Sequence, residues 1–576
     1  MSHPVIVLKF GSSIFKTQAA LADGVHEIYR WVRQGRRVVA VVSALEGVTD
    51  SLIATGKAIS ECPTPQAHAT LLATGELTTA ALLSYEFSRI GITSELLSPN
   101  AIELRTTGDG VNADPSSINI GALRAALHRA PVVIVPGFVG IDEQRSFTLL
   151  GRGGSDLTAI FIASQLGHAQ CRLIKDVDGL YERDPSLPGP TPRRFATLSW
   201  DNALTLDGGI IQHKAVRFAQ ERSLPVEVAT LQRDDASIVQ EGRTAWLRSI
   251  TQRPIKVGVL GKGVVGGGVL HHLQALPTHF QISGIFVRSI PKSSTSVPLN
   301  LFSTDAEAVI RDADIVVEAL GGIEPAYTLV SSALSQGKDV VTANKALIAR
   351  HGDTLEALAA SNGATIRYSA AVGGVVPMIE TTERIAAESG IMSLEGVING
   401  TCNYVLNQVA KGVSLSDAIT QAQRLGYAEA DPTRDLDGTD SLDKLLILAR
   451  KAFGSEPQIE IEQQGLSVDS LARVQQSQNP RSAIRLVASA TFKDNRIICR
   501  VAPQSLAPEH PLHTLEGARN RLVIAAKDAT THVVDGSGAG RWPTSEAVLA
   551  DLFDSWRQLA IQPAQKPSVL EEIAHV

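Results

Sequence analysis

Short apolar runs recur over the first 250 residues and alternate with longer amphipathic stretches. Runs rich in Val and Ile are typical of strands buried in a parallel sheet, and the intervening stretches have the length of helices. This alternation predicts an α/β fold, with a parallel-rich sheet and helices on both of its faces. The predicted strands are Val5–Phe10, Val38–Val42, Val132–Val135, Cys171–Ile174, Val226–Thr230 and Thr244–Ile250.

A second α/β pattern begins with the apolar run Ile255–Leu260. This run leads into Gly261-x-Gly263-x-x-Gly266, and a helix-like segment follows. In this dinucleotide-binding fingerprint the first glycine permits a tight turn, the second lets the backbone approach the pyrophosphate, and the third lets the helix pack on the strand. We expect a Rossmann domain, with further strands at Ile282–Val287, Ala313–Leu320 and Asp339–Thr342.

Longer strands and helices follow from about residue 365, as is typical of an α+β substrate and dimerisation domain. The β-rich stretches Ile484–Val501 and Arg521–Ala526 precede a final helix, Thr544–Leu559. The predicted domains are 1–248, a linker at 249–254, the Rossmann domain at 255–365, and a last domain at 366–576 whose C-terminal segment returns to the cofactor domain.

The amino-acid composition limits the classes of protein to which this chain can belong. The 576 residues are 44% hydrophobic and 19% charged, which is enough to build several cores. A net charge of −6 disfavours a nucleic-acid partner and a basic membrane face. The four cysteines are widely spaced, and no apolar stretch is long enough for a transmembrane helix. We expect a cytoplasmic enzyme with small-molecule substrates.

The end of the second Rossmann strand bears on cofactor choice. An acidic residue about 20 positions after the glycines would bind the ribose 2′-hydroxyl of NAD. This chain has Phe286-Val287-Arg288-Ser289 instead, with Lys292 nearby. Because Arg288 is suited to a 2′-phosphate, we expect NADP(H) to be preferred over NAD(H).

The stretch Gly426–Lys444 is dense in carboxylates. It runs into an amphipathic helix at 439–453, on which Asp440 and Lys444 share a face. Such a pair is most often a surface ion pair. The acidic loop before it, and its position downstream of a nucleotide-binding fold, favour a polar substrate site.

The second half resembles homoserine dehydrogenase. The resemblance covers nearly all of 255–576. It rests on Gly261–Gly266, Thr342-Ala-Asn-Lys345-Ala, Ala371-Val-Gly-Gly-Val-Val-Pro377, Asn399-Gly-Thr-Cys-Asn-Tyr404, Gly426–Lys444 and Gly536-Ser-Gly-Ala-Gly540.

The resemblance implies reduction of L-aspartate 4-semialdehyde to L-homoserine. It makes Lys444 the proton donor and places Lys345 near the nicotinamide and the substrate. Glu429 and Asp440 would hold the substrate amino group, with Asp435 in support. The implied cofactor residues are Gly261, Gly263, Val264, Val265, Gly266, Arg288, Ala319, Lys345 and Gly538.

A monovalent-cation site (Na⁺ or K⁺) is also implied, formed by the backbone carbonyls of Val372 and Gly374. Many relatives have an acidic residue where this chain has Ser369. The resemblance further implies a homo-oligomer, a dimer or a tetramer, formed through the dehydrogenase half.

The first half has no GxxxxGK[ST] motif, which excludes a P-loop kinase. Its motifs resemble aspartate kinase of the amino-acid kinase family over about 1–245. They are Val7-Leu-Lys9-Phe-Gly11-Ser-Ser13, Val41-Val-Ser43-Ala, Thr74-Gly-Glu76, Gly151-Arg152-Gly-Gly-Ser-Asp156 and Lys175-Asp-Val-Asp-Gly179-Leu-Tyr181.

This resemblance implies that aspartate is phosphorylated by ATP with Mg²⁺, a reaction that needs positioning and charge neutralisation. Lys9 and the amides of Gly11, Ser12 and Ser13 would stabilise the transferred phosphoryl group. The implied aspartate-binding residues are Ser43, Thr49, Glu76, Arg152 and Asp156, and the nucleotide contacts are Lys175, Asp176 and Tyr181.

Three departures from the family pattern leave an alternative open. Ser12 replaces a second glycine, Leu157 replaces threonine, and His213-Lys214 replaces His-Pro. In the alternative the kinase half is degenerate and serves scaffolding or ligand binding. A different Rossmann oxidoreductase fused to a glutamate- or carbamate-type kinase is a third reading, and the motifs Asn399–Tyr404 and Glu429–Lys444 argue against it.

The two halves follow each other closely. Bifunctional enzymes of this kind usually carry a regulatory region of paired ACT-type modules between them, of about 150 residues. Only a few residues separate Thr244–Ile250 from Ile255. We therefore expect threonine or lysine to inhibit this enzyme weakly or not at all by that route.

Overall fold

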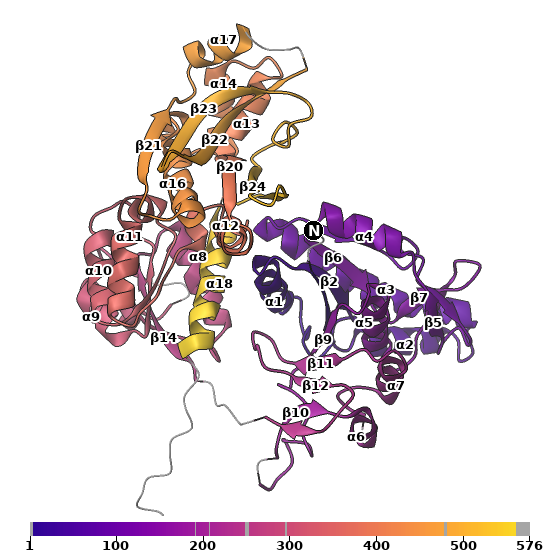
Figure 1. Cartoon of the computed structure of the whole chain (residues 1–576). Coiled ribbons are helices and arrows are strands. Elements are labelled where there is room, and N and C mark those ends of the chain that lie inside the picture. Colours follow the sequence, from indigo (N-terminus) through magenta and orange to yellow (C-terminus); the bar gives the residue numbers. More distant parts are fainter. Residues whose placement is uncertain are drawn as a thin grey trace, which may run out of the picture. The chain divides into compact units, whose positions relative to one another are not determined.

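A computed structural model describes residues 4–190, 192–206, 208–247, 253–293, 297–476, 481–538 and 540–559. Contacts divide the chain into two units, one from the first 251 residues and one from most of the remainder, and each is described by itself. Figure 1 shows their elements. Most of the predicted linker, part of the strand predicted at Thr244–Ile250, and the last 17 residues of the predicted final domain lie outside the described residues.

The first unit contains a nine-stranded sheet in the order β13-β10-β12-β11-β9-β1-β2-β6-β3. Its pairs are parallel except for β11 with β12 and β10 with β13, which confirms the predicted parallel-rich sheet. The strands are β1 (Val5–Phe10), β2 (Arg37–Val42), β3 (Ser94–Leu96), β6 (Val132–Pro136), β9 (Gln170–Ile174), β10 (Phe195–Leu198), β11 (Val226–Ala229), β12 (Ser237–Val239) and β13 (Ala245–Trp246).

Apolar side chains explain the centre of this sheet. Five of the six residues in β1 and in β2 are buried, as expected of strands covered on both faces. The helices of this unit are α1 (Leu21–Arg33), α2 (Val48–Ile59), α3 (Pro65–Ile90), α4 (Ile120–Arg129), α5 (Gly154–Gln165), α6 (Trp200–Thr205) and α7 (His213–Glu221).

A second, four-stranded sheet in this unit was not predicted. It has the order β5-β4-β7-β8. Its strands have only three or four residues, too few to form a hydrophobic pattern. They are β4 (Arg105–Thr107), β5 (Asp114–Ser117), β7 (Val139–Ile141) and β8 (Phe147–Leu149).

The second unit begins with the predicted Rossmann sheet. Its six strands are all parallel, in the order β16-β15-β14-β17-β18-β19. They are β14 (Ile255–Leu260), β15 (Phe280–Phe286), β16 (Phe302–Ser303), β17 (Ile315–Glu318), β18 (Asp339–Thr342) and β19 (Ile366–Arg367). The helices of this part are α8 (Val264–Ala275), α9 (Ala306–Asp312), α10 (Ala326–Ser335) and α11 (Lys345–Ser361).

The other sheet of this unit has the order β21-β23-β22-β20-β24-β25 and is antiparallel except between β21 and β23. Its strands are β20 (Ile391–Val397), β21 (Gln458–Gln463), β22 (Ala483–Lys493), β23 (Arg496–Leu506), β24 (Asn520–Ala526) and β25 (Thr531–Gly536). The associated helices are α12 (Met378–Glu388), α13 (Gly400–Val409), α14 (Leu415–Arg424), α15 (Thr433–Leu436), α16 (Thr439–Phe453) and α17 (Val468–Gln476).

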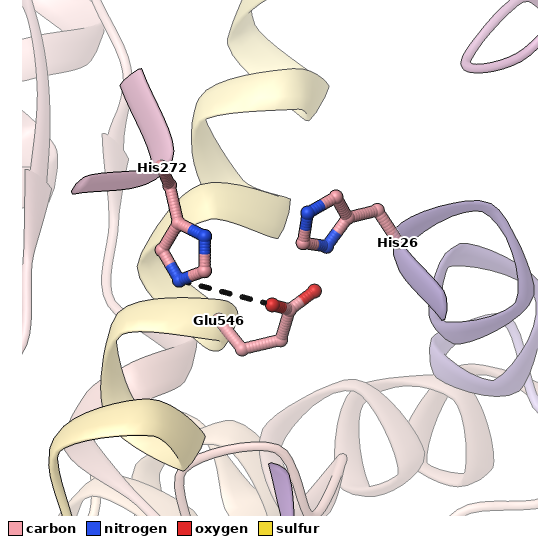
Figure 2. Close-up of side chains that lie close together, drawn as sticks. All are labelled: His26, His272 and Glu546. Carbon is pink, nitrogen blue, oxygen red and sulfur yellow. Dashed lines mark ion pairs between the residues drawn. The ribbon is translucent and has the colours of Figure 1, made fainter. Parts of the chain in front are cut away.

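The last helix, α18 (Arg541–Leu559), packs against α8 of the Rossmann part. Gly268 of α8 permits this close packing, because a Cβ there would lie 2.8 Å from the Cβ of Ser545. Next to this contact, His272 of α8 pairs with Glu546 of α18 at 3.9 Å (Figure 2). Among the described residues, no helix is both long and apolar enough to cross a bilayer.

Adjacent glycines of α8 provide a test of the fingerprint packing. A Cβ on Gly266 would lie 2.1 Å from the carbonyl oxygen of Gly261, whereas a Cβ on Gly267 has its nearest neighbour at 4.0 Å. We expect Gly266→Ala to destabilise the dehydrogenase unit by about 1–3 kcal/mol and to weaken NADPH binding. Gly267→Ala should be neutral or slightly stabilising, since alanine is the better helix former. Thermal unfolding and NADPH titration of both variants would test this, and equal behaviour would contradict it.

Candidate active sites

The glycine-rich turn connects β14 to α8 at the carboxyl edge of the Rossmann sheet. Gly261 has a φ of +104°, and a Cβ there would lie 2.7 Å from the carbonyl oxygen of Ala319. Gly263 is the N-cap residue of α8, and a Cβ there would meet nothing within 4 Å. The turn is therefore packed on one side and open at the helix N-terminus, where an anionic ligand is favoured.

Basic side chains lie at the same edge. Arg288 and Lys292 follow β15 and are exposed. Lys262, between the first two glycines, has its Nζ 4.8 Å from the ring centroid of Phe302 in β16, the strand that pairs with β15. Lys262 is not among the predicted cofactor residues, because this position of the fingerprint accepts any residue.

A buried carboxylate shapes the loop after β17. Glu318 is 1% exposed, and its Oε1 accepts the amide of Leu320 at 2.8 Å. Its other oxygen accepts the hydroxyl of Thr342, at the end of the neighbouring strand β18. Asn344 then caps α11, so that Lys345 is the first residue of the helix.

Asp440 is the centre of the next cluster. Its Oδ1 lies 2.7 Å from Nζ of Lys345, and its Oδ2 lies 2.7 Å from Nζ of Lys444. Lys444 also donates to the carbonyl of Ile398 at 2.9 Å. Burial alone would raise the pKa of Asp440, but the two lysines outweigh it and lower that pKa far below its usual range. Asp440 is therefore ionised, and it positions two ammonium groups from two helices.

Asn399 joins a second carboxylate to this cluster. Its Nδ2 donates to Asp435 and to Asp440, both at 2.7 Å, while its Oδ1 caps α13 by accepting the amide of Cys402. Burial raises the pKa of Asp435, which the Asn399 hydrogen bond opposes. The predicted residues Lys345, Asp435, Asp440 and Lys444 thus lie together. Glu429 is exposed, and its carboxylate has no partner among the described residues.

The same two helices, α11 and α16, are also joined near the C-terminal end of α16. Arg450 donates to the carbonyl of Ala349 at 2.6 Å. Lys451 pairs with Glu356 at 3.0 Å and with Glu383 of α12 at 2.8 Å. Burial acts to lower the pKa of Lys451, but its anionic and phenolic neighbours raise it above its ordinary value, so that its charge is retained.

The turn Gly373–Gly374 packs against Gly538. A Cβ on Gly538 would lie 1.9 Å from the carbonyl oxygen of Gly373, so these backbones touch. Beside this turn, Ser369 donates its amide and its hydroxyl to Asp551, which is 1% exposed. Ser369 is thus bound to a carboxylate that comes from α18.

In the first unit, a cavity of about 810 Å³ lies at the carboxyl ends of the central strands. Its lining includes Lys9, Gly11, Ser12, Ser13, Ser43, Thr49, Glu76, Arg152, Asp156, Lys175 and Asp176, all of which the sequence motifs singled out. Tyr181 is not part of the lining. Its hydroxyl donates to Asp178 at 2.6 Å, and burial together with that bond raises its pKa to about 12. The motifs missed His68, Ile210 and Gln212, which also line the cavity.

Asp156 holds two lysines in this cavity. Its Oδ1 lies 2.8 Å from Nζ of Lys9, and its Oδ2 lies 2.9 Å from Nζ of Lys175. Burial would raise the pKa of Asp156, but the two ammonium groups lower it. Burial also lowers the pKa of Lys9 to about 8, an effect that Asp156 opposes. Two positive charges thus lie next to the glycine turn that follows β1.

Glu76 and Arg152 have unused hydrogen-bonding capacity in the same cavity. One oxygen of Glu76 accepts the amide of Ala44 at 3.3 Å, and the other is buried without a hydrogen-bond partner among the described residues. Burial raises the pKa of Glu76 to about 7. Arg152 is exposed, and none of the described residues pairs with its guanidinium.

Two of the departures from the kinase pattern leave this geometry intact. Ser12 is exposed and lines the cavity. Leu157 is 1% exposed and belongs to the buried face of α5. Neither side chain displaces Lys9, Asp156 or Lys175.

Comparison with known proteins gives three family matches along the chain. Residues 4–230 match the amino acid kinase family, residues 261–369 match the NAD-binding domain of homoserine dehydrogenase, and residues 377–553 match homoserine dehydrogenase.

Relatives of the second half are homoserine dehydrogenases. The enzyme of Synechocystis sp. is 35% identical, over 52% of this chain and 73% of the relative. That of Corynebacterium glutamicum is 36% identical, over 53% of this chain and 72% of the relative. The crystal structure of a homoserine dehydrogenase from Thiobacillus denitrificans covers 54% of this chain and 74% of its own, with 34% identity and a TM-score of 0.49. The chain belongs to the homoserine dehydrogenase family, and its N-terminal amino acid kinase domain makes it a bifunctional enzyme of the aspartate pathway.

Proposed function

We propose that Lys444 donates the proton during reduction of L-aspartate 4-semialdehyde to L-homoserine. Carbonyl reduction needs a hydride, which NADPH supplies when bound, and an acid at the developing alkoxide. The observation that carries this role is the shared carboxylate of Asp440, which fixes Lys444 and Lys345 on its two oxygens. Lys444 is the less exposed of the two lysines, as suits a proton donor shielded from water.

The substrate ammonium group needs carboxylates that retain acceptor capacity. An ionised carboxylate has about four lone-pair sites. Lys345 uses one site on Oδ1 of Asp440, whereas Lys444 and Asn399 use Oδ2. We assign the remaining Oδ1 site and the unpaired Glu429 to the ammonium group. Asp435 supports them through Asn399.

NADP(H) is the preferred cofactor in this proposal. Arg288, Lys262 and Lys292 give the edge beyond β15 a positive charge, and the stretch Phe286–Ser289 offers no carboxylate to a ribose 2′-hydroxyl. The pyrophosphate would be held by the amides of Gly263, Val264 and Val265 at the start of α8, with Ala319 and Gly538 against the cofactor.

The turn after Ser369 provides some of the oxygen ligands that a monovalent cation (Na⁺ or K⁺) needs. The turn offers the carbonyls of Val372 and Gly374, and the carboxylate nearby is that of Asp551, which is bound to Ser369. We assign the ion a structural role. We also propose that the protein forms a dimer or a tetramer through its dehydrogenase half.

For the kinase half, we propose that Lys9 and the amides of Gly11, Ser12 and Ser13 stabilise the phosphoryl group during its transfer to L-aspartate. The pair of lysines on Asp156 supports this role, because phosphoryl transfer depends on charge neutralisation. Lys175, Asp176 and Tyr181 would contact ATP, which carries Mg²⁺.

Aspartate would be held by the free groups of the same cavity. The guanidinium of Arg152 suits its α-carboxylate in a bidentate geometry. The unpaired oxygen of Glu76 suits its ammonium group, with Ser43 and Thr49 beside it. The intact lysine pair and these free groups favour an active kinase over a degenerate one. Aspartyl phosphate formation, trapped with hydroxylamine, tests this directly, and its absence in the wild-type protein would contradict it.

Lys444→Ala should reduce homoserine oxidation by on the order of 10² or more, because the general acid/base is lost. NADPH should still bind, and aspartyl phosphate formation should be unchanged. Steady-state assays of both activities test this. Near-normal dehydrogenase turnover would remove Lys444 from its proposed role.

Lys9→Ala is the reciprocal variant. It should abolish aspartyl phosphate formation, because one of the two ammonium groups near the transferred phosphoryl is removed. Dehydrogenase activity should stay at the wild-type level. Loss of both activities together would instead show that the substitution unfolds the protein.

The fall of kinase kcat/KM at acidic pH should reflect protonation of the Glu76 carboxylate. Its pKa is raised to about 7, so below that pH the carboxyl is neutral and binds the ammonium group of aspartate poorly. We expect kcat/KM for aspartate to fall as pH drops below about 7, approaching tenfold per pH unit. In Glu76→Gln, kcat/KM should be low and independent of pH in this range. An unchanged acidic limb in that variant would assign the titration to another group.

A further inference from the structure

Lys214 lies at the second position of α7, where the aspartate kinase pattern has proline. Its Nζ is surrounded by four oxygen acceptors. It lies 2.9 Å from the carbonyl of Ala113, 3.2 Å from Oδ1 of Asn112 and 3.2 Å from the carbonyl of Leu150. It also pairs with Asp114 at 3.0 Å. A single ammonium group thus makes charge-assisted hydrogen bonds to two separate segments.

Both segments belong to the four-stranded sheet that the sequence did not predict. Ala113 directly precedes β5, and Leu150 directly follows β8. The amide of Ala113 donates to the carbonyl of Leu149 at 2.8 Å, so the two segments are also joined to each other. Lys214 therefore links the four-stranded sheet to α7 through hydrogen bonds and an ion pair.

The turn that carries Arg152 starts immediately after Leu150. Gly151 and Gly153 both have a φ of +75°. A Cβ on Gly151 would lie 2.1 Å from Oδ1 of Asn112, and a Cβ on Gly153 would lie 2.4 Å from Cγ of Gln212. The turn is therefore packed between the side chains of Asn112 and Gln212. Asn112 accepts a hydrogen bond from Lys214, and Gln212 lies two residues before Lys214 in the chain.

We propose that Lys214 is a positioning residue that holds Arg152 in place for the α-carboxylate of aspartate. Lys214 is not part of the cavity lining, whereas Arg152 is, so Lys214 acts through the turn. The inference rests on the proposed role of Arg152. It also explains why lysine is accommodated where the pattern has proline.

The phosphoryl-transfer groups are held by different contacts. Lys9 and Lys175 are fixed by Asp156, which is 3% exposed. Loss of the Lys214 ammonium should therefore loosen acceptor binding and leave the chemical step nearly unchanged. This separation of KM from kcat distinguishes positioning of Arg152 from general support of the fold.

The test is Lys214→Met in the full-length protein, with aspartyl phosphate trapped as the hydroxamate. KM for aspartate should rise by about tenfold or more, while kcat and KM for ATP change by less than about threefold. Lys214→Arg should restore most of the lost affinity, because a guanidinium can donate to the same oxygens. Asp114→Asn is the matched control and should change KM by less than about twofold, since its pair is largely exposed.

L-Aspartate α-amide is a probe for the group that Arg152 recognises. Because it lacks the anionic α-carboxylate, Lys214→Met should raise its KM by no more than about twofold. An equal rise for aspartate and its α-amide, or an unchanged KM for aspartate, would overturn the inference.

A second variant covers the case in which Lys214→Met does not fold, as judged from its circular dichroism and thermal unfolding. Asn112→Ala removes the side chain packed against Gly151 and should show the same rise in KM for aspartate. An unchanged KM in Asn112→Ala would then overturn the inference. A wild-type protein that forms no aspartyl phosphate would refute the proposed kinase function itself, and this inference with it.

Discussion

Each active site depends on one buried aspartate that must be paired with two lysines. An ionised carboxylate removed from water is costly unless opposite charges and hydrogen bonds surround it. Asp156 and Asp440 are 3% and 4% exposed, and each binds one lysine on each oxygen. Both lysines of Asp156 come from other elements, whereas Asp440 has one partner, Lys444, on its own helix and the other, Lys345, on α11, so the full set of contacts forms only when these elements meet. Folding therefore completes each of these charged clusters.

The two lysine pairs serve different chemistry in different surroundings. Burial lowers the pKa of Lys9 to about 8, whereas for Lys345 the charge of Asp440 outweighs burial and raises the pKa. Phosphoryl transfer needs positive charge that stays in place. Carbonyl reduction needs, in addition, a proton that leaves its donor and is replaced. In the proposed mechanism these two tasks fall to neighbouring side chains: Lys345, whose pKa is raised, keeps its charge, and Lys444 donates the proton.

The sequence predicted the elements that have a long hydrophobic pattern or a fixed motif. The helix at 439–453 and the strand Asp339–Thr342 have the predicted bounds, and the glycine spacing at Gly261–Gly266 matches the packing of the turn. The four-stranded sheet was missed, because strands of three residues show no periodicity. Lys214 and Lys262 were not recognised as site residues, because their partners come from elements distant in sequence or from turns whose geometry only the fold defines.

The double attachment of α11 to α16 has a mechanical consequence. Asp440 near the start of α16 binds Lys345 of α11, and Arg450 and Lys451 near the end of α16 bind residues in the first and middle turns of α11. A single contact near the start of α16 would leave this helix free to pivot on α11, whereas contacts near both ends of α16 restrict that rotation. These contacts hold α16 against α11, the helix that follows β18 of the Rossmann sheet. The exposed loop bearing Glu429, which precedes α16, has no such attachment through the Glu429 side chain among the described residues.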